Sequence, residues 1–136
     1  MARLLSDGDL QVREAAALAL RAMGKGAAGA IPDLCAALKD PAGTVRMTAA
    51  LALGSIGDAA TGAVPALALA FSLPDQNQLT NEDVQVLRSI AYALGEIGPG
   101  ASGAVPALSK AKHLRVKYIA DEAVSRIEGH QVPTWH

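Results

Sequence analysis

Residues 24–34 read Gly-Lys-Gly-Ala-Ala-Gly-Ala-Ile-Pro-Asp-Leu, and closely similar blocks stand at residues 57–67 and 98–108. The three blocks share the pattern G-x-x-A-x-G-A-(I/V)-P-x-L. They are 33 and then 41 residues apart, so the second interval carries 8 extra residues. Self-similarity at a nearly constant period indicates an array of repeated structural units.

An apolar stripe with helical spacing precedes each block. Its positions follow i, i+3, i+4, i+7, i+8 and i+11, which places them on one face of an α-helix. Stripes of this kind begin at Val12, Val45, Val86 and Val116. A shorter stripe follows the first two blocks and fades after the third. The pattern therefore predicts two helices in each unit.

Glycine and proline mark the expected helix ends. A glycine in the left-handed region ends a helix without a steric penalty, and a proline fits the first turn of the next helix. The glycines at the helix ends are Gly24, Gly57 and Gly98. The prolines at the helix starts are Pro32, Pro65 and Pro106. No segment alternates with the period of a strand. We therefore predict an all-α fold, a short right-handed α-solenoid (α-α superhelix) of stacked antiparallel helix pairs.

The repeat divides the chain, predicted to be a single domain over 1–136, into five parts. We expect a partial helix at 1–8, units at 9–40, 41–74 and 75–113, and a partial terminal unit at 114–136. Asp40 with Pro41, and Asn81, are expected to cap first helices. The third unit carries an insertion at 72–81, for which a binding edge and a tolerated surface loop are both open.

Two units of the pattern indicate a family. The segments D-x-x-x-x-V-R-x-x-A-A-x-A-L and A-L-G-x-I-G-x-x-A-x-x-A-V-P-A-L resemble the HEAT-like repeats named after phycobilisome lyases. The resemblance implies a binding scaffold. It also implies an ion-pair ladder between successive repeats, formed by Asp7, Arg13, Asp40 and Arg46. Leu87 departs from this pattern, because it replaces the arginine in the third unit.

The two ends of the array differ in sequence. Positions that are alanine in the first three units become Asp121 in the last, and Glu122 stands where the others carry Leu or Tyr. Charge at an outer face is what a terminal repeat requires. We therefore expect a C-terminal end to the array here, while a piece of a longer array stays open.

Composition excludes several classes of function. Twelve Lys and Arg against 13 Asp and Glu give a net charge of −1, which creates no overall attraction to nucleic acid. Cys35 is the single cysteine, so neither an internal disulfide nor a CxxC site is available. The longest apolar run, 63–73, is interrupted by Pro65 and too short to span a bilayer. We expect a cytoplasmic protein with neither nucleic-acid nor membrane partners.

Candidate chemical motifs favour ordinary structural explanations. The G-x-G-x-x-G matches at 24–29 and 98–103 each follow a helix, whereas a phosphate-binding loop follows a strand. Three scattered histidines give no metal-ligand spacing, and one basic cluster is expected to be a solvated edge. The histidines are His113, His130 and His136. The basic cluster consists of Lys110, Lys112, His113, Arg115 and Lys117. We predict no enzyme activity, cofactor or metal.

The outer faces of the second helices, which line the concave side of such solenoids, are the candidate functional surface. We predict that a helix or extended segment of another protein lies across them, with contacts at Asp33, Ala37, Leu69, Leu73 and Lys110. By family resemblance, a bilin lyase subunit or phycobilisome-associated factor is an alternative. Self-association of a fragment through the ends of the array, giving a homo-oligomer, is a third.

Overall fold

The computed structural model describes residues 2–75, 78–111 and 114–129, and every regular element in these ranges is helical. The first helices are α1 (Leu10–Met23), α3 (Gly43–Ile56), α5 (Asn81–Ile97) and α7 (Leu114–Ile127). The second helices are α2 (Ile31–Ala37), α4 (Val64–Ser72) and α6 (Val105–Ser109). Four 3₁₀-helices complete the order: η1 (Ala2–Ser6), η2 (Gly24–Ala30), η3 (Gly57–Ala63) and η4 (Gly98–Ala104).

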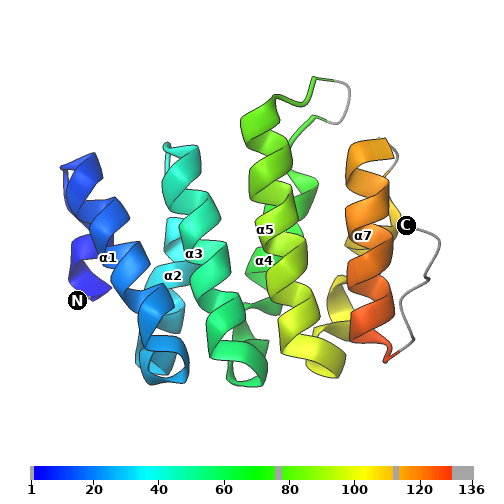
Figure 1. Ribbon diagram of the computed structural model, residues 1–136, viewed down its shortest axis with the longest axis horizontal. Coiled ribbons are helices and arrows are strands. Elements are labelled where there is room, and N and C mark those ends of the chain that lie inside the picture. The colour runs from blue at the N-terminus through cyan, green and yellow to red at the C-terminus, as the bar shows by residue number, and fades with distance from the viewer. Residues whose placement is uncertain (1, 76–77, 112–113, 130–136) are drawn as a thin grey trace.

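The helices form two layers. The first helices stand side by side in one row, and α2 and α4 lie behind it (Figure 1). Each second helix runs antiparallel to the first helix that precedes it. We call the outer surface of α1, α3, α5 and α7 the first-helix face, and that of η1, α2, α4 and α6 the second-helix face. The predicted all-helical solenoid of stacked helix pairs is therefore confirmed.

Glycine ends three of the first helices. Gly24, Gly57 and Gly98 have φ of 55°, 76° and 78°, with ψ between −129° and −143°. The positive φ agrees with the prediction, but this ψ lies outside the left-handed helical region. It belongs to a region that is essentially restricted to glycine. The chain reverses at these residues and enters the second layer.

The repeated block is more ordered than a turn. Its first seven residues are 3₁₀-helical in all three copies, with a kink at Ala60 in the second, and the α-helix begins at the next residue. Proline occupies the first turn of each second helix, as predicted, because the missing N–H has no helical acceptor there. The third second helix is only five residues long, which matches its fading apolar stripe.

The starts of two first helices differ from the prediction. The side chain of Asp40 accepts a hydrogen bond from the Ala42 amide at 2.8 Å, but α3 begins only at Gly43. The N-cap of α5 is Thr80 rather than Asn81. Thr80 and Asp83 form a capping box, in which each side chain accepts from the other residue's amide at 3.0 Å.

Small residues let the first helices approach closely. Ala17, Ala50 and Ala91 are all buried between neighbouring first helices, and leucine and isoleucine side chains fill the space between the two layers. This close approach adds dispersion contacts to a core that has few aromatic residues. At Gly54, a methyl group would lie 3.0 Å from the ring of Tyr92 and 3.1 Å from Cα of Ala93.

Residues 43–72 are, by length and composition, apolar enough to cross a membrane, because an 18-residue window within them has a mean hydropathy of 1.3. The structure divides this stretch into α3, η3 and α4, which form a hairpin at Gly57. Half of that 18-residue window is buried inside the fold. Its hydropathy is thus that of a helix pair at the centre of the array.

Candidate protein-binding surface

An arginine joins the first helix pair to the turn before the second. Arg13 Nε donates to Asp40 Oδ2 at 2.8 Å, and Arg13 Nη1 donates to the carbonyl oxygens of Asp7 and Gly8. Asp7 also belongs to the predicted ladder, but its carboxylate accepts from the Asp9 amide at 2.8 Å. The Arg13 guanidinium therefore binds the backbone of one turn and the carboxylate of the next.

Arg46 repeats this arrangement one unit later. Its Nη1 donates to the carbonyl oxygens of Asp40 at 2.7 Å and Pro41 at 3.1 Å. The position that corresponds to Asp40 is Asn81, and Arg46 instead lies 3.8 Å from the exposed carboxylate of Glu82. The planar guanidinium suits such a junction because it donates in several directions at once. These contacts join each helix pair to the next.

The structure places the predicted contact residues on α2, α4 and the end of α6. Asp33 and Lys110 are exposed, and Leu69 and Leu73 are 52% and 67% exposed. Ala37 is only 5% exposed, and its role as a contact residue stays a prediction. Helix α2 ends at Ala37, whose carbonyl oxygen accepts a hydrogen bond from the Asp40 amide.

Two grooves recur on the second-helix face at the repeat period. The η1–α2 groove has a volume of about 370 Å³. The second, which we call the α2–α4 groove, has a volume of about 400 Å³ and lies between the turn that follows α2 and the end of α4, with three residues of α5 also lining it. Their linings correspond at a spacing of 33 residues: Leu5 and Leu38, Asp7 and Asp40, Arg13 and Arg46, Ala37 and Ala70. Leu73 lines the second groove and Asp33 the first, whereas neither groove is lined by Leu69 or Lys110.

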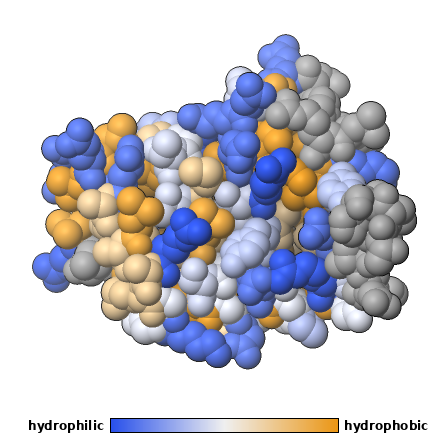
Figure 2. Space-filling view, viewed as in Figure 1, coloured by the Kyte–Doolittle hydropathy of each residue, from blue (hydrophilic) through white to orange (hydrophobic). Residues whose placement is uncertain are grey.

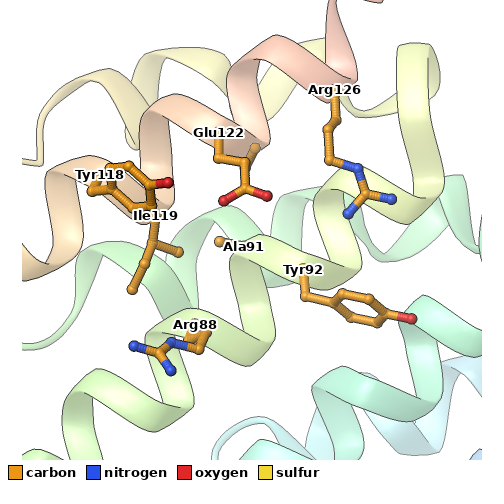
Figure 3. Close-up of a pocket in the computed structure, with 8 residues that line it drawn as sticks. Arg88, Ala91, Tyr92, Tyr118, Ile119, Glu122 and Arg126 are labelled. Carbon is orange, nitrogen blue, oxygen red and sulfur yellow. The ribbon is translucent and has the colours of Figure 1, made fainter. Parts of the chain in front are cut away.

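A third groove lies on the first-helix face, where the sequence predicted no site. It has a volume of about 320 Å³ and runs between α5 and α7. Arg88, Tyr92, Tyr118, Glu122 and Arg126 line it above a floor of small apolar side chains (Figure 3). This face is hydrophobic toward α1 and mostly hydrophilic over α5 and α7 (Figure 2). The register of the repeat could have located the groove, because Glu122 breaks an apolar pattern.

Some predicted features lie outside the described residues. These are Lys112, His113, His130 and His136, and the side chain of Arg115. Within the described part of the basic cluster, Lys117 pairs with Asp121 at 3.4 Å. Burial raises the pKa of the Cys35 thiol, which packs against the core.

A family model of HEAT repeats matches residues 1–76, which is more than half of the chain. The chain belongs to the HEAT repeat family. The phycobilisome-lyase type of HEAT-like repeat stays a prediction from the sequence. No curated protein matches this HEAT repeat chain.

A solved structure has a similar fold. The crystal structure of an engineered protein from the Northeast Structural Genomics Consortium superposes with a TM-score of 0.65 at 22% sequence identity. The match covers 95% of the HEAT repeat chain and 61% of the engineered chain. Because the identity is low, this likeness shows the fold alone.

Proposed function

We propose that this HEAT repeat protein is a non-catalytic scaffold that holds a segment of another protein on its second-helix face. The observation that carries the proposal is the pair formed by Leu69 on α4 and Leu73 at its C-cap. These two large apolar side chains are mostly exposed, and Leu73 lines the α2–α4 groove. Contiguous exposed apolar surface typically marks an interaction site. HEAT repeat arrays are typically scaffolds of this kind, which supports the proposal.

The grooves favour a segment that crosses the helices. Because the η1–α2 and α2–α4 grooves recur at the repeat period, a bound helix or extended strand can place successive side chains in them. The apolar walls of the second groove include Leu38, Ala70 and Leu73, while Lys39 and Arg46 provide polar groups. An apolar centre with a polar rim is the usual composition of a protein interface.

Selection from a displayed random peptide library tests this function. We expect the full chain to enrich peptides whose affinity falls about tenfold or more in the variant Leu69→Asp/Leu73→Asp, because two buried leucine contacts are lost. Affinities would be measured by fluorescence anisotropy, with circular dichroism to verify the helical content of each variant.

Leu18→Asp is the matched control. Leu18 is 52% exposed, as is Leu69, but it lies on α1. The same peptides should bind this variant with unchanged affinity. The proposal is overturned if the library yields no enriched peptide, or if all enriched peptides bind wild type and the double variant equally.

Two further functions stay predictions. Bilin handling rests on the resemblance to phycobilisome lyases, and an absorption spectrum of the protein mixed with bilin tests it. Self-association through the ends of the array is tested by light scattering over a concentration series.

A further inference from the structure

The groove between α5 and α7, which we call the α5–α7 groove, lies where the repeated side-chain packing between first helices is interrupted. At the preceding junction, between α3 and α5, the ring of Tyr92 lies against Gly54, where a methyl group would approach its Cε2 atom to 3.0 Å. One unit later, the position of Tyr92 is occupied by Glu122 and that of Gly54 by Gly95. Gly95 is covered by Arg126 instead, whose Cδ would lie 3.3 Å from a methyl group there.

The exchange of tyrosine for Glu122 leaves the α5–α7 junction without the aromatic ring that Tyr92 supplies one unit earlier. Glu122 is shorter than tyrosine, and its carboxylate points into the space between α5 and α7 (Figure 3). Tyr92 and Tyr118 line the groove on the two helices, and Ala91, Ile119 and Ala123 complete its apolar lining. The groove therefore combines apolar walls, two phenol rings and one central carboxylate.

The charges around the groove are unevenly paired. Arg126 forms an ion pair with Glu96 and lies 6.0 Å from the centroid of the Tyr92 ring. Among the residues that the structure describes, neither Arg88 nor Glu122 has an ion-pair partner within 4 Å. Arg88 projects to the far side of Ile119, away from Glu122 (Figure 3). The Glu122 carboxylate and the Arg88 guanidinium are therefore available to pair with charged groups of a ligand.

We propose that the α5–α7 groove binds a lysine or arginine side chain of a partner protein segment, with an acidic residue of that segment beside it. The basic side chain lies along the apolar floor, and its charged end reaches Glu122 next to the tyrosine rings. An ammonium or guanidinium group near an aromatic face gains a cation–π attraction in addition to the ion pair. The acidic residue pairs with Arg88. This surface is separate from the second-helix face, so the two proposals stand independently.

Peptides selected on the full chain from a displayed random library test the proposal. We expect one class of peptides to contain a Lys or Arg next to an Asp or Glu. Its affinity should fall about fivefold for Glu122→Gln and further for Glu122→Lys, since a charge-assisted contact is removed and then reversed. Replacing the peptide's basic residue by norleucine should produce the same loss, and no additional loss in Glu122→Gln.

Asp121→Asn is the matched control, because Asp121 is the adjacent exposed acid and does not line the groove. This variant and Leu69→Asp/Leu73→Asp should bind the class with wild-type affinity. The proposal is overturned if no selected peptide responds to Glu122→Lys. It is also overturned if the responsive peptides are purely acidic and bind Glu122→Gln more tightly, which would identify an anion site at Arg88 and Arg126.

Discussion

Arg13 and Asp40 are 27 residues apart in sequence, yet their side chains meet at 2.8 Å between the first two helix pairs. The side chain of Asp40 is 7% exposed and that of Arg13 is 16% exposed. Asp40 also accepts from the Ala42 amide just before α3. One carboxylate therefore satisfies a mostly buried cation and a backbone donor at the same junction.

We expect Asp40→Ala to destabilise the fold by about 2 to 4 kcal/mol, because it leaves a mostly buried guanidinium and an amide without their acceptor. Urea unfolding followed by circular dichroism would measure this as a lower transition midpoint.

Asp58→Ala is the control for this prediction, since Asp58 is an exposed acid in η3. It should change the unfolding free energy by less than about 0.5 kcal/mol, as surface substitutions usually do. Equal midpoints for the two variants would show that the Asp40 junction does not stabilise the array.

A second prediction concerns the close approach of α3 and α5. Gly54→Ala places a methyl group 3.1 Å from Cα of Ala93 and 3.0 Å from the Tyr92 ring. Backbone atoms cannot move aside as a side-chain end can, so we expect a loss of about 1 to 3 kcal/mol despite the better helix propensity of alanine.

Gly43→Ala is the matched comparison, because it also lies in α3. The three atoms nearest to its methyl group all belong to the exposed Glu82 side chain, which can rotate away. The helix propensity gain of up to about 1 kcal/mol should then leave this variant as stable as wild type or more stable. If Gly54→Ala is the more stable of the two, the junction is looser than the structure shows.

The repeat itself was predictable because its signals are local. Glycine at a helix end and proline at a helix start restrict the backbone of a few residues, and the apolar stripe fixes which face is buried. The 3₁₀ conformation of residues 24–30, 57–63 and 98–104 was not predicted, since i→i+3 bonding leaves no distinct sequence pattern. Thr80 was missed as the N-cap because neighbouring Asn81 also suits that role.

The candidate sites depend on contacts between units, which a single helix does not determine. Helical spacing put Ala37 on the outer face of α2, but the fold leaves it only 5% exposed. From the same spacing, Glu122 was interpreted as a sign that the array ends there. That Glu122 leaves a groove in the packing follows only from the structure, in which the Tyr92 ring lies against Gly54 at the preceding junction.

A third prediction isolates backbone strain at the helix ends. Gly57 has φ +76° and ψ −140°, and a methyl group there would meet no atom within 4 Å. Any loss of stability in Gly57→Ala is therefore conformational, and we expect about 1 to 3 kcal/mol by urea unfolding. Gly62→Ala should be neutral, because this glycine has a negative φ and equally open surroundings. Equal losses in both variants would exclude strain as the cause.

The last prediction concerns the thiol of Cys35. Burial raises its pKa because the charged thiolate is poorly solvated beside the core, so less thiolate is present at any given pH than for a free cysteine. We expect Ellman's reagent to react with the native protein at pH 8 at least about threefold more slowly than with the same protein unfolded in guanidinium, because the thiolate is the reactive form. The native rate should rise with pH, and its midpoint should lie above that of the unfolded chain.

The raised pKa also determines how the free energy of unfolding depends on pH, because the folded state binds the thiol proton more tightly than the unfolded state does. The contribution of this group is therefore fully present below the unfolded pKa and is lost as the pH rises through the folded one. Equal native and unfolded rates across this pH range would contradict both the burial of the thiol and the direction of its shift.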